Sequence, residues 1–246
     1  MNRIFLSILP IAAKICIILS FIFFCISVIY INRSPLDYQQ GVLVKILYLH
    51  VPCAWLSLLC YASMTIFALG VLITNNFICA AALRVMAPIG ANFTALTLIC
   101  GSLWGAKSWG IWWAWDARLV SELLLLFIYL SIIALHKNFT EQNTADFAAS
   151  VLCLLGSINL PIIKFSIKWW NSLHQGATIS WNNANNIDPL MLKALLNCSL
   201  TLLFFMVALF LLKLKLEFLG RTVELRKRRL LRLNYINNIK ETKNGY

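Results

Sequence analysis

Charged residues are scarce in this chain of 246 residues, of which only 12% are Asp, Glu, Lys or Arg. In a typical soluble domain, about a quarter of the residues are charged. With 61% hydrophobic residues and a mean hydropathy of +0.79, the composition excludes a water-soluble globular protein and a disordered one. Among the charged residues, the acidic ones are the fewer, with 9 Asp and Glu against 21 Lys and Arg, which gives a net charge of +12. Because about half of the basic residues follow the last apolar run, we relate this excess to a membrane and not to a nucleic acid.

Long polar stretches are also few, and apolar runs take up most of the chain. A run of about 18 apolar residues is long enough to span a bilayer as a helix, and continuous runs exclude the alternating strands of a membrane barrel. The sequence therefore predicts an all-α integral membrane protein, a bundle of six transmembrane helices. The runs are Ile15–Ile31, Ile46–Ile73, Ala81–Leu103, Leu119–Leu135, Phe147–Ile163 and Leu190–Leu212.

The distribution of Lys and Arg predicts the orientation of these spans. Basic residues near the N-terminus, after the fourth run and in the C-terminal tail all fall on one side, so we expect both termini in the cytoplasm. The first run lacks a small-residue cleavage site and is interpreted as an uncleaved anchor. We divide the chain into a transmembrane domain at 1–217 and a basic cytoplasmic tail at 218–246. That tail is interpreted as a topology signal on a solvated helix, with anionic lipid as the alternative contact.

Cysteine and glycine motifs that would indicate other functions are missing. The eight cysteines form neither C-x-x-C nor C-x-x-C-H, which excludes the usual covalent haem attachment and the usual thioredoxin site. The segment Gly101–Ser108 nearly fits a phosphate-binding loop, but Ala106 replaces the required second glycine and no strand precedes it. We therefore expect no ATP site in this chain.

Tryptophan is abundant instead, and its placement is informative. Five of the nine Trp fall in the segment from Trp104 to Arg118, the predicted outer loop between the third and fourth helices. An interfacial aromatic belt is the simpler explanation, but a belt scatters one or two Trp per helix end. We therefore favour a platform for a large flat aromatic ligand. Its residues are Trp104, Trp109, Trp112, Trp113 and Trp115.

The charged residues that follow the tryptophans have two possible roles. Asp116 is in position to cap the fourth helix; alternatively it shapes the loop or contacts a partner. Arg118 and Glu122 are four residues apart on one helix face, and we expect an ion pair between them. Arg118 is also one of several candidates for binding a ligand carboxylate. The other candidates are Lys107, Lys164 and Lys168.

Histidines number only three, and two of them fall on the predicted outer side. His50 lies about a turn inside the second span, and His174 lies in the third outer segment. His136 ends the fourth helix on the opposite side of a core about 30 Å thick. Imidazole pairs are common axial ligands of haem iron, whereas zinc would need further ligands that are not evident. A structural hydrogen bond at His50 and a solvated loop position at His174 are the alternatives.

At this point the residues resemble a known family. The stretch Trp104–Arg118 is similar to the tryptophan-rich "WWD" signature of haem-handling membrane proteins in cytochrome c biogenesis. With His50-Val-Pro52, Ser121-Glu122 and the segment from Trp169 to Gly176, the chain resembles the haem exporter protein C family over about residues 33–212. It departs from the pattern at Lys107 and Ile111, where Pro and Thr are expected, and at Val120, where Thr is more usual.

The resemblance implies a function that the residues alone do not. It implies non-covalent binding of haem b at the outer face of a bacterial or mitochondrial inner membrane, with His50 and His174 as axial ligands. The Trp loop, with Asp116 and Arg118, would contact the haem and a periplasmic haem chaperone. Partner subunits of an ABC-type complex would supply the ATP-driven step, so the chain itself would not be an enzyme.

Two other functions stay open from the sequence. One is a b-type membrane redox cytochrome, which usually stacks haems across the bilayer and so needs a second histidine pair. The other is a plain permease subunit, in which the Trp and His residues serve only for packing.

Overall fold

The computed structural model describes residues 3–170, 172, 174 and 187–244. Within them it contains seven α-helices and a short 3-10 helix, and no strands. Six segments are long and apolar enough to cross a membrane, which confirms the predicted six-span bundle. The elements are α1 (Arg3–Arg33), η1 (Val42–Ile46), α2 (Leu47–Thr74), α3 (Phe77–Ser108), α4 (Ala117–Asn138), α5 (Gln142–Gly156), α6 (Asn159–Trp169) and α7 (Pro189–Asn244).

The fifth span consists of two helices rather than one. The chain turns at Ser157 and Ile158 between α5 and α6, which together form the span Gln142–Trp169. The backbone N–H of Ser157 still donates to the carbonyls of Cys153 and Leu154 at 3.1 Å, so the break leaves few polar groups free in the apolar layer. The side chain of Asn159 then donates to the Ser121 carbonyl at 2.8 Å and ties α6 to α4.

The core lies between α2, α3, α4 and α5. Its largest fully buried side chains include Tyr61 and Tyr129, whose rings meet edge to face at 5.2 Å. Tyr129 donates to the Ser57 carbonyl at 2.8 Å, so its hydroxyl is satisfied inside the apolar layer. A Cβ at Gly90 would overlap the ring of Tyr129, so glycine there lets α3 and α4 approach closely.

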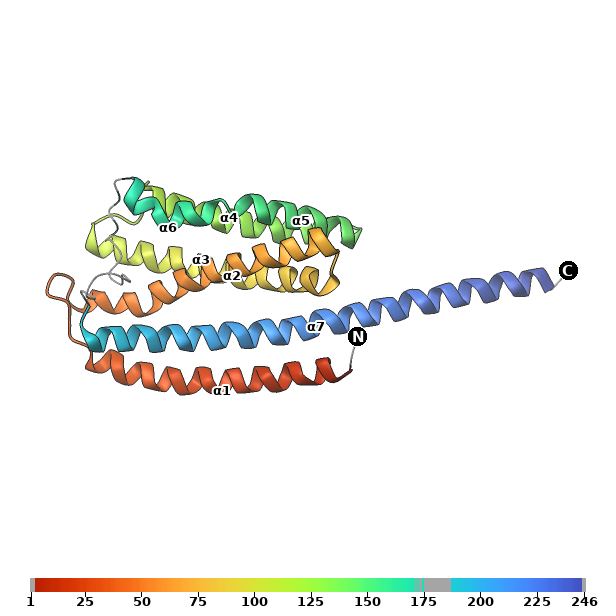
Figure 1. Ribbon diagram of the computed structural model, residues 1–246, viewed down its shortest axis with the longest axis horizontal. Helices are drawn as coiled ribbons and strands as arrows, with labels where there is room; N and C mark the ends of the chain where they lie inside the picture. Colours follow the sequence, from red (N-terminus) through yellow and green to blue (C-terminus); the bar gives the residue numbers. More distant parts are fainter. Residues whose placement is uncertain (1–2, 171, 173, 175–186, 245–246) are drawn as a thin grey trace.

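α1 and α7 pack side by side at the edge of the bundle (Figure 1). Only 11% of the most apolar part of α1 is buried within the chain, so this helix presents apolar side chains to its surroundings. α7 has 56 residues and runs about 84 Å at 1.5 Å per residue, far more than the ~30 Å hydrocarbon core requires. α7 therefore continues well beyond the bundle. It is not interrupted at residue 217, where the predicted transmembrane domain ends and the predicted tail begins.

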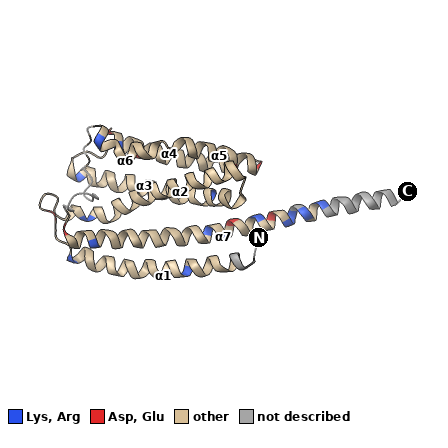
Figure 2. Ribbon diagram, viewed as in Figure 1, with Lys and Arg blue, Asp and Glu red and all other residues tan. Residues whose placement is uncertain are grey.

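The two ends of the bundle differ in composition. The described N-terminal end of α1, the α2–α3 and α4–α5 turns and the extension of α7 lie at one end, which we call the terminal end (Figure 1). Lys and Arg gather on α7 beyond that end (Figure 2). The η1 segment and the α3–α4 loop lie at the other end, which we call the loop end. The first described turn of α1 and the extension of α7 thus lie opposite the Trp loop, while the compartment that each end faces stays a prediction.

Candidate functional site

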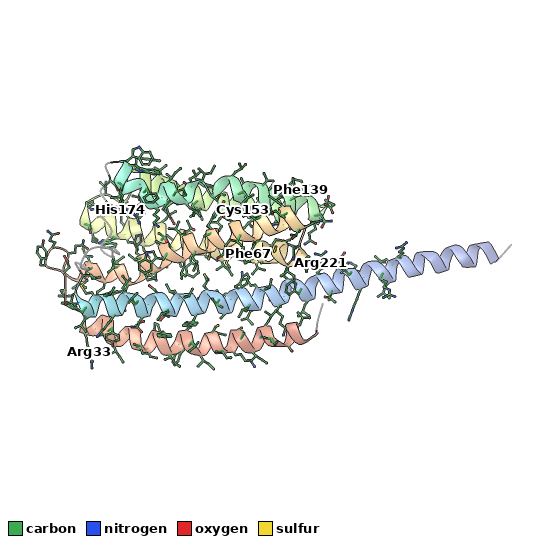
Figure 3. The ribbon with its side chains drawn as sticks, in the orientation of Figure 1. Arg33, Phe67, Phe139, Cys153, His174 and Arg221 are labelled. Carbon is green, nitrogen blue, oxygen red and sulfur yellow. The ribbon has the colours of Figure 1, made fainter. Side chains whose placement is uncertain are left out.

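Three segments that are distant in sequence meet at the loop end of the bundle. They are the first turn of α2 with His50, the end of α3 with its loop up to the start of α4, and residues 172 and 174, which follow α6. Figure 3 shows His174 at this end, away from Phe139 and Arg221 at the terminal end. The structure thus places both predicted outer histidines beside the Trp-rich loop.

His50 is held against α3 by a hydrogen bond and by close packing. Its Nδ1 lies 3.1 Å from the backbone carbonyl oxygen of Thr97. A carbonyl only accepts, so Nδ1 carries the proton and Nε2 keeps its lone pair. A Cβ at Gly101 would lie 3.1 Å from Cε1 of His50, so glycine makes room for the imidazole. The Trp104 indole stands edge to face against it, with centroids 5.8 Å apart.

His174 is held by Asp116. Its Nδ1 lies 3.2 Å from Oδ2 of Asp116, and the Ser172 hydroxyl donates to the same oxygen at 2.8 Å. The other carboxylate oxygen accepts from the backbone N–H of Leu119 at 2.8 Å and caps α4, as the sequence predicted. One buried carboxylate therefore both starts α4 and orients the imidazole.

The electrostatics of this pair fix the tautomer of His174. Burial raises the pKa of Asp116, but the hydrogen bonds from Leu119, Ser172 and His174 outweigh it, so the net pKa lies below the ordinary value of 3.8. Burial lowers the pKa of His174 below 6.5, against the opposing effect of Asp116. At neutral pH a carboxylate thus faces a neutral imidazole, and only Nδ1–H can donate to it. Nε2 of His174 then carries the lone pair that can bind a metal.

The two imidazoles lie close enough that a positive charge on His174 would act on His50. Arg118 acts electrostatically on both of them. Histidine ligands in metal sites usually donate their second ring N–H to a carbonyl or a carboxylate. His50 uses a carbonyl for this and His174 a carboxylate, so both residues fit the requirements of axial nitrogen ligands.

The five loop tryptophans do not form one continuous wall. Trp104 contacts His50, and its Nε1 donates to Gln40 at 3.0 Å. Trp109 contacts His174, with ring centroids 5.2 Å apart. Trp113 and Trp115 stand edge to face at 5.8 Å, so they are not coplanar. Two rings therefore flank the histidines, and the others lie further along the loop.

Two of the tryptophans are largely exposed. Trp112 is 65% and Trp115 is 83% exposed, and Trp169 and Trp170 on the neighbouring segment are also exposed. The Nε1 of Trp113 is buried and has no hydrogen-bond partner among the described residues. Exposed indoles at the rim of a site are typical of surfaces that bind a ligand or another protein.

The predicted direct ion pair between Arg118 and Glu122 is not formed. Glu122 is buried and accepts a hydrogen bond from Ser57 at 2.9 Å, and Ser57 accepts one from Thr94. The two charges still influence each other electrostatically, but they are not within direct ion-pair distance. Sequence spacing placed them on one face of α4 and could not show that α2 offers Glu122 a closer donor.

The remaining candidates lie apart from the histidines. Lys107, Lys164 and Lys168 are exposed at the loop end. His136 lies near the terminal end, with Nδ1 3.5 Å from Oδ1 of Asp146. It is therefore separated from the other two histidines, as predicted. Residues 175–186, which include Gly176 and Trp181, fall outside the described residues.

Several residues of the site were not identified from the sequence. Thr97 acts through its backbone carbonyl, which no side-chain motif signals. Gly101 drew attention only through the discarded phosphate-loop match. Ser172, two residues before His174, and Gln40, in the first loop, are ordinary polar residues whose partners become visible only when the segments are brought together.

The fold and site define a polytopic membrane protein with two imidazoles and a tryptophan-rich loop at one end of the bundle. The sequence model of the family described as Heme exporter protein C matches residues 2–229, and the chain belongs to this family. Relatives with that name include one from Bradyrhizobium diazoefficiens, 45% identical over 190 residues, which are 77% of this chain and 72% of the relative.

Two further relatives show the breadth of the family. Heme exporter protein C of Escherichia coli K12 is 49% identical over 158 residues, which cover 64% of this chain and 63% of the relative. A putative cytochrome c biosynthesis ccmC-like mitochondrial protein of Marchantia polymorpha is 46% identical over 147 residues, covering 60% of this chain and 62% of the relative. The matched regions thus span about two thirds of these relatives.

Proposed function

We propose that this protein handles haem during cytochrome c maturation, by binding haem b non-covalently at the loop end and presenting it to a periplasmic haem chaperone. His50 and His174 supply the axial nitrogens. Haem is the cargo here, and the chain contributes ligands, a boundary of indoles and a docking surface. The family membership and the names of the relatives support the coarser statement of haem handling.

One observation carries the finer proposal. Both imidazoles have Nδ1 engaged by an acceptor on the protein, the Thr97 carbonyl for His50 and Asp116 for His174. Each ring is thereby oriented, and each carries its lone pair on Nε2. A lone pair on the nitrogen opposite the hydrogen bond is what an axial ligand requires.

The loop tryptophans have two different roles in this proposal. Trp104 and Trp109, which touch the histidines edge to face, exclude water from the ligand nitrogens and limit the space beside them. Trp112 and Trp115, which are exposed, form a contact surface for the chaperone. Arg118, whose charge acts on both imidazoles, is the candidate partner for a haem propionate.

The orientation follows the positive-inside rule, with the loop end in the periplasm, or in the equivalent space outside a mitochondrial inner membrane. The chain then works as a non-enzymatic component of a larger assembly. We propose that ABC-type partner subunits provide ATP hydrolysis. The exposed apolar side chains of α1 offer those subunits or the lipid a contact face.

The test is the absorption spectrum of the purified full chain after expression with haem. We expect a six-coordinate low-spin spectrum that disappears in His50→Ala and in His174→Ala. Imidazole added to either variant should restore it, which separates a lost ligand from a misfolded protein. His136→Ala is the matched control and should behave like the unchanged chain.

Two outcomes would contradict the assignment. A normal spectrum in either Ala variant would show that the ligand lies elsewhere. Haem that stays bound in the presence of a chaperone, and is reduced by quinol, would favour the redox cytochrome instead. The scarcity of histidine speaks against that alternative, since the third residue, His136, has no second histidine to pair with on its side.

A further inference from the structure

A second concave site lies at the terminal end of the bundle, where α7 leaves it beside the first turn of α3. Figure 3 places Arg221 at this point of α7. A hollow of about 600 Å³ opens there, which we call the α3–α7 pocket. It is lined by Phe77, Ile78, Phe218, Arg221, Thr222, Leu225, Arg226 and Arg229. Neither the histidines nor the Trp loop take part in it.

The floor of the α3–α7 pocket is apolar and firmly packed. The rings of Phe77 and Phe218 meet at 5.6 Å, and the Phe218 side chain is fully buried. The Arg221 guanidinium carbon lies 3.6 Å from the centroid of the Phe77 ring, a close cation–π contact. Arg221 is therefore held against the aromatic floor, where it lines the pocket.

The rim of the pocket is basic. Arg226 and Arg229 follow on the same helix, and none of the described residues that line the pocket is acidic. The neighbouring hollow of about 480 Å³ shares Arg221 and Leu225 with this pocket, but it is also lined by Glu141, Glu217 and Glu224. Acidic side chains thus gather in that hollow, and the α3–α7 pocket is the one of the two that favours an anion.

The pocket lies at the end of the bundle from which α7 continues (Figure 1). Phe77 begins α3 directly after the turn that joins the α2 and α3 spans. At 1.5 Å per residue, Arg226 lies about 12 Å and Arg229 about 16 Å along α7 from Phe218. Helical side chains lean toward the N-terminus, which here is the direction of the bilayer. This lean brings both guanidinium groups closer to the headgroup layer, which is about 5–8 Å thick on each side of the hydrocarbon core.

We propose that the α3–α7 pocket binds an anionic phospholipid of the leaflet at the terminal end. The acyl and glycerol part would lie against Phe77, Ile78 and Leu225, over the buried Phe218, and the phosphate between Arg226 and Arg229. The apolar floor favours a whole lipid over a free phosphate ion, which would gain nothing from aromatic rings. Basic pockets between transmembrane helices are known to bind acidic lipid headgroups. Such a lipid would anchor α7 beside α3 independently of the haem site.

The test measures lipid retention by native mass spectrometry of the full chain in detergent, with phosphatidylglycerol and phosphatidylcholine offered in turn. We expect phosphatidylglycerol adducts to outlast phosphatidylcholine adducts. Arg226→Gln combined with Arg229→Gln should weaken the phosphatidylglycerol adduct about 25-fold, at about fivefold per arginine. Lys213→Gln combined with Lys227→Gln removes the same charge from exposed positions outside the pocket and should leave the adduct unchanged.

Three results would overturn the proposal. One is equal retention of the two lipids, and another is equal loss in the arginine pair and the lysine pair. The third is the capture of a polypeptide by a photo-crosslinking amino acid placed at Leu225 in intact membranes, which would show that the pocket is a protein interface. A lipid adduct in the same experiment would support the α3–α7 pocket as a lipid site.

Discussion

Replacing Asp116 by Asn tests whether the orientation of His174 matters for haem binding. Asn is as good an N-cap as Asp, so the hydrogen bond from the Leu119 N–H is retained and α4 should still begin at Ala117. The second carboxylate oxygen, 3.2 Å from Nδ1 of His174, becomes either a neutral acceptor or an amide that donates. A donating amide would leave Nδ1 unprotonated and place the proton on Nε2, the atom proposed to bind iron.

The expected magnitude follows from the roles of the two oxygens. Losing a partner that orients a metal ligand typically costs 10–100-fold in affinity, about 1.4–2.7 kcal/mol. The loss of negative charge at the start of α4 should cost the fold only about 0.3–1 kcal/mol. Haem affinity, measured by titration of the absorption band, should therefore fall much more than the thermal stability of the chain in detergent.

Asp37→Asn is the matched control. Asp37 also lies at the loop end and accepts backbone N–H bonds, from Gln39 and Gln40 at 2.8 Å, but it does not contact either histidine. It should leave haem affinity unchanged. The reasoning would be refuted if Asp116→Asn bound haem as tightly as the unchanged chain, or if both variants lost affinity equally.

Three further predictions concern other parts of the structure. Gly101→Ala should weaken haem binding about tenfold, because its Cβ would stand 3.1 Å from Cε1 of His50 and displace the ring. Gly220→Ala, with open space around it, should leave binding unchanged. Equal haem affinity in the two variants would contradict this. The fall of haem affinity on acidification should have its midpoint below pH 6.5, because ligation needs neutral His174 and burial holds the pKa of His174 below that ordinary value. A midpoint near pH 7.5 would contradict this. Arg84→Leu should destabilise the chain by about 3 kcal/mol, because Asp146 and Glu217 lose the arginine that lies within 3.2 Å of both carboxylates. The unfolding temperature in detergent should fall, and an unchanged value would refute this.

The fold was largely predictable because its cause is local. An apolar run long enough to cross a bilayer must form a helix, since no water is present to satisfy its backbone. Residue composition alone therefore predicted six spans. The break between α5 and α6 at Ser157 and Ile158 was missed, because a continuous apolar run contains no marker of a turn that another helix stabilises.

The candidate site was predictable only in part. His50, His174 and Asp116 stood out because polar residues near apolar spans are rare, and the Trp loop because five indoles in so short a segment are unusual. The partners of these residues lie on other helices, and their spacing in the sequence carries no information about them. Glu122 shows the difference: its neighbour on α4 suggested an ion pair with Arg118, but its actual partner is Ser57 on α2.

The sequence by itself determined the number of spans, the separation of the Trp loop from the termini, and the residue types available for binding. Burial in lipid and the positive-inside rule act on composition, and composition can be read without coordinates. Tertiary structure alone decided that the Thr97 carbonyl and Asp116 hold the two imidazoles by Nδ1, and that only two of the five loop indoles contact them. Those contacts depend on the packing of α2, α3 and the start of α4 against one another, because hydrogen bonds and ring contacts require positions within a few ångströms.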